Sequence, residues 1–295
     1  MLSDRKKTIR IGTRGSLLAL EQTERVMAAL KEKDPQLQIE KVILRTQGDK
    51  ILDQPLLAFG GKGVFITEFE EALAEGTIDL AVHSAKDMPM ETADGLVIAG
   101  ALPRADVRDV LVTKKGAPED AIIGTGSLRR QFQLKAVYPN MQCISIRGNV
   151  PTRLQKIQNG ECDGVVLAAA GLERLGLLEE QGLDYRYFSL DEMIPAGGQG
   201  IIAIEGRKND EITDLVSGIS NENAMLELET ERSILQLLEA GCHEAIGVIS
   251  KVEKEDIAVQ IIRESDGNIY RRQGRTVIGK RLELARQLVE ELKKN

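Results

Sequence analysis

Cys242 stands in an unusual stretch of sequence, AGCHEAIG (residues 240–247), between a glycine and a histidine and just after a charged helical pattern. A cysteine in such a loop could ligate a metal, act as a nucleophile, carry a covalently attached group or have no chemical role. A Cys–His dyad is disfavoured, because neighbouring side chains usually diverge and His83 is the only histidine besides His243. No C-x-x-C or H-x-x-x-H spacing offers a metal site. The loop alone therefore leaves the chemistry of Cys242 open.

Arginines recur in three loops that follow predicted strands. Loop glycines free backbone N–H groups, helix N-termini contribute partial positive charge, and the arginine fork matches carboxylate or phosphate. The alternative is that these arginines are solvated surface residues, but three such loops in a chain of net charge −7 weaken it. We therefore predict anion-binding sites in these loops. The residues are Arg14, Ser16, Ser127, Arg129, Arg130, Arg147 and Arg153.

The segment HSAKDMP (83–89) follows a predicted strand, IDLAVH, and places Lys86 and Asp87 at its carboxyl end. A carboxylate in that place can stabilise developing positive charge or handle a proton. The alternative is an ordinary surface ion pair between the two side chains. His83 lies on the apolar run, which predicts a packed core histidine and not a base.

A further glycine loop, GGKG (60–63), offers a single cation, Lys62. It lacks the G-x-x-x-x-G-K-[ST] spacing of a P-loop, so nucleotide binding has little support. A mobile lid whose lysine contacts an anion fits the composition better.

Alternating strand and helix patterns predict an α/β fold with parallel, doubly wound sheets. Expected strands cover 8–13, 38–46 and 78–83, and expected helices cover Leu17–Leu30, with Ser16 as N-cap, and 65–76, with Gly76 at its end. The last part of the chain differs. Alternating runs at Ile246–Val252, Ile257–Arg263 and Ile269–Val277 and a helix at Leu282–Lys293 predict a small antiparallel α+β unit, with Cys242 at its entrance.

Two short patterns occur twice. IGTGSLRRQ (123–131) echoes IGTRGSLLALEQ (11–22), and G-x-x-D-x-x-V begins at both Gly76 and Gly160. The echo predicts two α/β domains of similar topology. Ligands of open α/β sheets collect at the carboxyl ends of the strands, so we expect the site there.

Composition narrows the function classes. A length of 295 residues favours two or three compact units. The net charge of −7 and the absence of tryptophan argue against a nucleic-acid surface. The N-terminus MLSDRKKTIR has no apolar signal region, no run is long enough to span a bilayer, and three cysteines suit a reducing compartment. We expect a cytoplasmic protein, in which Cys143 and Cys162 are small buried hydrophobic residues.

The chain resembles the porphobilinogen deaminase (hydroxymethylbilane synthase) family in a set of motifs that stand in the family's order over residues 9–250: RIGTRGS, GGKG, AVHSAKDMP, GTGSLRRQ, IRGNVPTRL, LAAAGLERLGL, IPAGGQG and EAGCHEAIG. The resemblance implies two lobes like those of periplasmic binding proteins and a small C-terminal α+β domain. It implies lobe 1 at 1–102 with a return segment at 199–219, lobe 2 at 103–198 and the cofactor-bearing domain at 220–295.

The resemblance also implies an enzyme, a transferase that joins pyrroles by C–C bonds and releases ammonia. Cys242 would carry a dipyrromethane cofactor through a thioether, and this primer would accept four porphobilinogen units before water releases 1-hydroxymethylbilane. Asp87 would be the catalytic group that accepts pyrrole N–H bonds and stabilises the cation left by ammonia. No metal, nucleic acid or membrane is implied, and we expect a monomer.

Each pyrrole carries an acetate and a propionate, so the growing chain is a polyanion. The resemblance assigns cofactor or substrate binding to Arg14, Ser16, Lys62, Ser84, Lys86, Thr125, Ser127, Arg129, Arg130, Arg147, Arg153 and Arg174. Many relatives have a lysine where this chain has Ala58, so either Lys62 carries more of the lid contact or the lid binds more weakly. A two-lobed anion-binding protein or sensor without catalysis is the alternative, and a thiol hydrolase is a weaker one.

Overall fold

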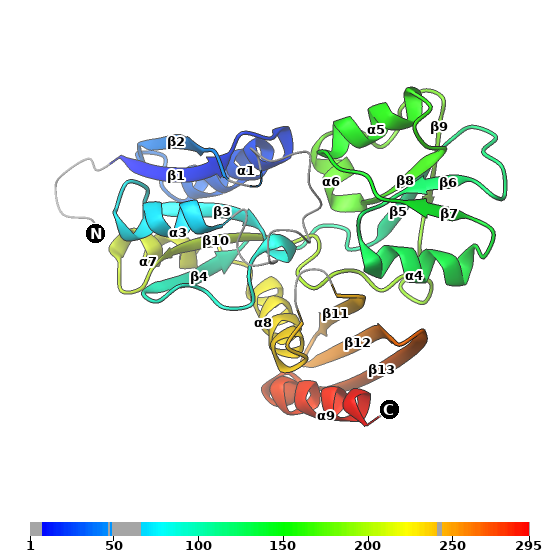
Figure 1. The fold of residues 1–295 in the computed structure, drawn as a ribbon. Coiled ribbons are helices and arrows are strands. Elements are labelled where there is room, and N and C mark those ends of the chain that lie inside the picture. The colour runs from blue at the N-terminus through cyan, green and yellow to red at the C-terminus, as the bar shows by residue number, and fades with distance from the viewer. Residues whose placement is uncertain (1–7, 47, 49–65, 241–243, 295) are drawn as a thin grey trace. The chain divides into compact units, whose positions relative to one another are not determined.

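The computed structural model describes residues 8–46, 48, 66–240 and 244–294 (Figure 1). The chain divides into two compact units, one made of Met1–Arg104 and Ile201–Leu226 and the other of Ala105–Gly200 and Glu227–Asn295. The family resemblance implies boundaries at 102/103, 198/199 and 219/220, whereas these units place residues 227–295 together with 105–200. The division into three domains stays a prediction.

The first unit is a five-stranded sheet with helices. Its elements are β1 (Ile9–Arg14), α1 (Leu17–Lys33), β2 (Ile39–Leu44), α3 (Thr67–Ala74), β3 (Leu80–Ser84), the 3-10 turn η2 (Ala85–Asp87), β4 (Leu96–Ala101), β10 (Ile202–Arg207), α7 (Glu211–Leu215) and η3 (Val216–Gly218). As predicted, Gly76 follows α3, and its φ of +70° is the left-handed conformation that ends helices.

Helices cover both faces of this sheet (Figure 1). Because side chains of a strand alternate between faces, Leu80 and Val82 of β3 pack with α1 and α7, whereas Ala81 packs with α3. A Cβ at Gly12 would lie 2.5 Å from Cδ1 of Ile78, so a larger residue at this position of β1 would displace the Ile78 side chain. The sheet is doubly wound, as the sequence predicts.

The second unit contains another five-stranded sheet, also covered on both faces, with α5 and α6 on one and α4 on the other. Its elements are β5 (Asp109–Lys114), β6 (Ile122–Gly124), α4 (Leu128–Val137), β7 (Gln142–Ile144), α5 (Val150–Gln158), β8 (Gly164–Ala168), α6 (Ala169–Arg174) and β9 (Leu183–Tyr187).

The two sheets share one plan. Their strand orders are β2-β1-β3-β10-β4 and β7-β6-β8-β5-β9. In each, the first three strands pair in parallel and the fourth runs antiparallel to both neighbours. The predicted similarity in topology of the two α/β domains is therefore confirmed. The prediction of parallel pairing fails for β10 and β5, because each enters its sheet from outside the local strand–helix alternation.

The repeated aspartates have the same role in both sheets. Asp79 accepts a hydrogen bond from the backbone N–H of Arg10 at 2.9 Å, and Asp163 accepts one from that of Ile122 at 2.8 Å. In each case the aspartate's own N–H donates to the carbonyl of the same residue. The carboxylate therefore continues the pairing between neighbouring parallel strands beyond the last ladder bond.

The rest of the second unit is an antiparallel sheet in the order β11-β12-β13 with two helices on one face. Its elements are α8 (Glu222–Leu237), which starts within the first unit's residues, β11 (Ile246–Glu253), β12 (Asp256–Ser265), β13 (Asn268–Val277), η4 (Ile278–Lys280) and α9 (Arg281–Lys293). On the other face Ile249 and Ile262 pack against Ile194, Val107 and Phe132. This contact explains why 227–295 join 105–200.

Asp163→Asn is expected to lower the free energy of unfolding at pH 7 by up to about 1 kcal/mol, because Lys114, its ionic partner, is half exposed. The hydrogen bond from Lys114, followed by that from the N–H of Ile122, lowers the pKa of Asp163. Because the pKa of Asp163 is lower in the folded protein than in the unfolded chain, the charged carboxylate stabilises the fold at pH values above the unfolded pKa, near 4. This stabilisation is lost as the pH falls through the folded pKa. Urea unfolding at pH 7 and at about pH 3 checks this.

The difference between parent and variant should thus shrink in acid. Asp184→Asn, at an exposed position of β9, is the control and should change stability at neither pH. An equal loss at both pH values would show that the Asp163 charge contributes nothing.

Candidate active site

In the first unit, predicted site residues lie at the carboxyl ends of the adjacent parallel strands β1 and β3. Arg14 ends β1, and Ser16 caps α1 by accepting the N–H of Ala19 at 3.3 Å, which confirms the predicted N-cap. Ser84 ends β3, and its hydroxyl is hydrogen-bonded to the buried amide of Gln22 on α1 at 2.8 Å. Gln22 therefore ties the loop after β1 to the loop after β3.

Asp87 lies in η2, directly beyond β3, with Lys86 beside it. Asp87 is exposed and Lys86 is half-buried. Within the described part of the chain, the Asp87 carboxylate accepts no hydrogen bond and forms no ion pair, so it is not the surface ion pair with Lys86 that the sequence left open. The carboxylate is accessible at the carboxyl edge of the parallel strands.

His83 is 6% exposed, which confirms the predicted core histidine. Its ring contacts Phe69 edge-on, with 5.1 Å between centroids, and its Nε2 lies 3.1 Å from Oε2 of Glu205 on β10. Burial of a carboxylate requires such a partner. The pair joins β3 to β10 beneath the turn that carries Asp87.

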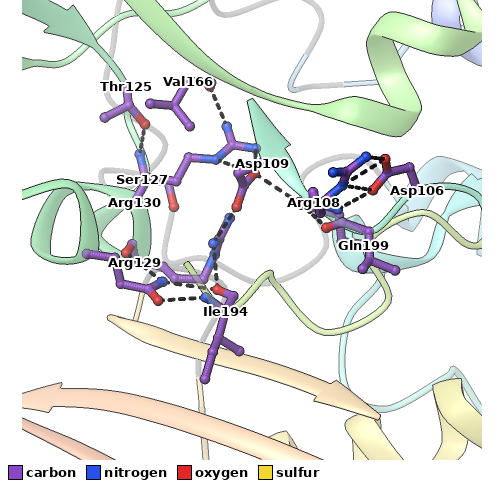
Figure 2. Close-up of polar contacts among 12 residues, drawn as sticks. Asp106, Arg108, Asp109, Thr125, Ser127, Arg129, Arg130, Val166, Ile194 and Gln199 are labelled. Carbon is purple, nitrogen blue, oxygen red and sulfur yellow. Dashed lines mark hydrogen bonds and ion pairs between the residues drawn. The ribbon is translucent and has the colours of Figure 1, made fainter. Parts of the chain in front are cut away.

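In the second unit, predicted site residues follow the parallel strands β6, β7 and β8. Thr125 is buried after β6, and its hydroxyl accepts the N–H of Ser127 at 3.2 Å (Figure 2). Ser127 precedes α4 but does not cap it with its side chain, unlike Ser16 at α1. Its hydroxyl and the start of α4 remain suited to an anion.

Arg129 and Arg130 are buried, 4% and 6% exposed, so the surface interpretation is wrong for both. Figure 2 shows the two guanidiniums converging on Asp109, the first residue of β5. Arg129 donates to Oδ2 at 2.7 Å, and Arg130 donates twice to Oδ1, from Nη2 at 2.7 Å and from Nε at 3.0 Å. They also donate to backbone carbonyls, of Ile194 and Val166 respectively.

These three side chains, the arginine cluster, hold two positive charges and one negative. Burial lowers the pKa of Arg129, and Asp109 acts against that effect. Gln199 adds a neutral donor to Oδ1 of Asp109 at 3.1 Å. Arg108 is nearby but engages Asp106 at 2.6 Å and lies over the ring of Tyr187.

The other predicted arginines of this unit are distributed around the same edge. Arg147 follows β7 and is half-buried. Arg153 lies in the first turn of α5, whose cap is Asn149, and donates to the carbonyl of Gly148 at 2.8 Å. Arg174 ends α6, is 8% exposed, and donates to the carbonyl of Gly200 at 2.6 Å. The structure thus gathers the predicted residues that it describes into two groups, one in each unit.

Lys62 and Cys242 lie outside the described residues. The elements on either side of Cys242, α8 and β11, are tied to a loop that contacts the arginine cluster. Glu231 on α8 accepts the N–H of Gly198 at 2.6 Å and that of Ser250 on β11 at 2.7 Å. Gly198 precedes Gln199, which donates to Asp109.

The other two cysteines have surroundings typical of structural residues. Cys162 is buried in the core of the second sheet, as predicted, whereas Cys143 is half-buried. Burial raises the pKa of both thiols. Across the described ranges, no group of three or more His, Cys, Asp and Glu side chains is arranged to hold a metal ion. No described helix has the length and apolar character needed to cross a membrane.

Sequence reasoning missed Asp109, Gln199 and Gln22. Asp109 stands before the apolar run VLV, where a lone carboxylate was a usable signal of a buried partner. Gln199 belongs to a motif, IPAGGQG, that the sequence highlighted without assigning a side chain. Gln22 offered no signal, because its partner Ser84 is 62 residues away.

Comparisons with known proteins agree with the motifs. Residues 9–214 match a family model described as "Porphobilinogen deaminase, dipyromethane cofactor binding domain". The porphobilinogen deaminase of Alkaliphilus metalliredigens is 44% identical over 268 residues, covering 88% of this chain and 84% of the relative. That of Lachnospira eligens is 48% identical over 246 residues, covering 81% and 82%. That of Roseiflexus sp. is 42% identical over 273 residues, covering 90% and 89%.

Among solved structures, the periplasmic aliphatic sulphonate binding protein SsuA from Escherichia coli covers 79% of this chain with a TM-score of 0.41 and 13% identity. That likeness is too low to bear on function. The family model and the named relatives support an enzyme and not the anion-binding or sensor alternative. Since the similarity extends over more than four fifths of its length, the chain belongs to the porphobilinogen deaminase family.

Proposed function

We propose that this chain joins four porphobilinogen molecules, with loss of ammonia at each step, on a dipyrromethane held by a thioether to Cys242, and that water then releases 1-hydroxymethylbilane. The observation that carries the proposal is the arginine cluster. Two buried guanidiniums share one carboxylate there, and this donor set suits an added carboxylate. The acetate and propionate of every pyrrole supply such groups.

The dipyrromethane, when bound, supplies the free α-carbon at which the chain grows. Cys242 suits its attachment, because a thiol is a soft nucleophile that can capture a methylene-pyrrole electrophile. In the second unit, Arg129, Arg130, Arg147, Arg153 and Arg174 hold carboxylates of cofactor or substrate, and Thr125 and Ser127 supply hydroxyls. In the first unit, Arg14, Ser16, Ser84 and Lys86 do the same, together with Lys62.

Asp87 is the catalytic group of this proposal. Its exposed carboxylate stands beyond β3 and is available to accept the N–H of a pyrrole. Loss of ammonia leaves positive charge on that ring, which the negative charge of a neighbouring carboxylate stabilises. The equivalent place in the second sheet, after β8, holds the apolar start of α6, Ala169–Ala170. The chemistry therefore belongs to the first unit's edge.

We also propose that the enzyme is a cytoplasmic monomer that binds neither nucleic acid nor membrane. The net charge of −7 disfavours a nucleic-acid surface. Light scattering during gel filtration measures the mass of the particle directly. A mass twice that of the chain would contradict the proposal of a monomer.

Intact mass under denaturing conditions tests the main proposal. The purified protein is expected to exceed its sequence mass by one dipyrromethane, because a thioether survives denaturation. Brief incubation with porphobilinogen should add further pyrrole units in steps. An anion-binding protein without catalysis would show the sequence mass alone, before and after the incubation.

A further inference from the structure

Asp109 lies at the carboxyl edge of the parallel strands of the second sheet, although it is the first residue of its own strand. The reason is that β5 runs antiparallel to β8, so Asp109 pairs with Ala168, the last residue of β8. The side chain is completely buried. It offers Oδ2 to Arg129 and Oδ1 to Arg130 and Gln199, so both oxygens are committed to holding donors in place.

The positive charge around Asp109 exceeds its own charge. Arg129 and Arg130 occupy the first turn of α4, where the helix dipole adds further positive potential and makes cations unfavourable. A single carboxylate compensates one guanidinium and leaves the other without a full counter-charge. Asp109 thus allows two arginines to be buried at a helix N-terminus while the cluster keeps a net attraction for anions.

The first sheet contains a matched carboxylate. Asp79 is also buried between two arginines, accepting from Arg10 at 3.2 Å and Arg207 at 3.3 Å. It precedes β3, however, and so lies at the amino end of the parallel strands, opposite the edge that carries Asp87. Asp79 and Asp109 are both buried and each is shared by two arginines, although Arg10 and Arg207 are more exposed than Arg129 and Arg130. The two aspartates occupy opposite ends of their sheets.

We propose that Asp109 is a positioning residue for the reaction, which fixes the guanidiniums of Arg129 and Arg130 so that together they receive one carboxylate of the cofactor or substrate. The inference rests on the proposed function of these arginines. Two physical effects of Asp109 have opposite consequences for ligand binding. Its negative charge repels an incoming anion. Its hydrogen bonds, here called the clamp, hold the guanidiniums of Arg129 and Arg130 in the orientation that binds a carboxylate. Three hydrogen bonds to Asp109 hold the two guanidiniums in place, and the proposal is that this orientation outweighs the repulsion.

Asp109→Asn separates the two effects, because asparagine keeps the shape, loses the charge and turns one acceptor into a donor. The clamp predicts that the fraction of purified protein carrying the adduct falls, and that KM for porphobilinogen rises about tenfold or more, as loss of a charge-assisted hydrogen bond implies. In the loaded fraction, kcat should change much less than KM. The charge effect alone predicts a lower KM. Intact mass gives the loaded fraction, and initial rates per loaded molecule give KM and kcat.

Asp79→Asn is the matched control, since it also removes a buried carboxylate shared by two arginines. It should lower the melting temperature as Asp109→Asn does, while adduct and KM stay at the parental level. Asp109→Glu is the second variant. It keeps the charge, and so spares the fold an unbalanced pair of cations, but displaces the oxygens, so the clamp predicts that loading falls and KM rises here too.

The outcomes distinguish failure of the positioning role of Asp109 from failure of the proposed function. Parental loading and a KM within about twofold of the parent in Asp109→Asn or Asp109→Glu would overturn the positioning role, as would equal defects in Asp79→Asn. A parent protein without any adduct would instead overturn the proposed function itself.

Discussion

Cys242→Ser is expected to yield a folded protein that carries no dipyrromethane and turns over no porphobilinogen. A serine hydroxyl is a far poorer nucleophile than a thiol at neutral pH, and it lacks the soft sulfur that captures a methylene-pyrrole electrophile. The change is small in volume, so the fold should persist. Intact mass, circular dichroism and the rate of porphobilinogen consumption measure the three expectations separately.

Cys143→Ser is the matched control for this experiment. Cys143 is a half-buried thiol in β7, and burial raises its pKa, which keeps it protonated and unreactive. Its replacement should leave the adduct and the turnover as in the parent. A normal adduct on Cys242→Ser, or its loss from Cys143→Ser, would move the attachment point to another residue.

Local features of the fold were predictable because their causes are close together in sequence. Ser16 caps α1 through the N–H of Ala19, three residues away, and Gly76 ends α3 with a backbone angle that few other residues adopt. The position of Asp87 was also within reach, since a residue that follows a parallel strand must lie at the carboxyl edge of the sheet.

The arginine cluster was only half predictable. The sequence indicated that Arg129 and Arg130 stand at the start of a helix, after a glycine-containing loop, and that they bind an anion. It did not indicate that the anion nearest to them is Asp109, 20 and 21 residues earlier in the chain. That contact depends on β5 entering the sheet next to β8 in the antiparallel direction, which no local pattern encodes.

The same limit applies to the strand order of the first sheet. β10 lies between β3 and β4 but follows both of them in sequence by a whole five-stranded sheet. Its residues read as an ordinary apolar strand, IAIEGR, with one buried acid. Glu205 is that acid. The sequence shows only a polar residue in an apolar run, and the structure adds that its partner is His83.

Asp87→Asn is expected to give a folded protein whose turnover is lower by at least about 10²–10³-fold. Asparagine keeps nearly the same shape and still accepts a hydrogen bond from a pyrrole N–H, so substrate positioning should be largely retained. What it removes is the negative charge opposite the cation that ammonia leaves behind. Since a similar cation must form when water releases the product, both elongation and release should slow. The rate of porphobilinogen consumption and the masses of enzyme-bound intermediates report the two steps.

The comparison must use protein with verified adduct, because assembly of the cofactor itself needs the same chemistry. Asp94→Asn is the matched control, because Asp94 is an exposed aspartate of the first unit just before the amino end of β4, and the variant should turn over as the parent does. If loaded Asp87→Asn consumes porphobilinogen within a few-fold of the parental rate, the charge of Asp87 does not stabilise the cation. The carboxylate beyond β3 would then serve to orient the pyrrole, and the source of electrostatic stabilisation would have to be sought elsewhere along the same edge of the sheet.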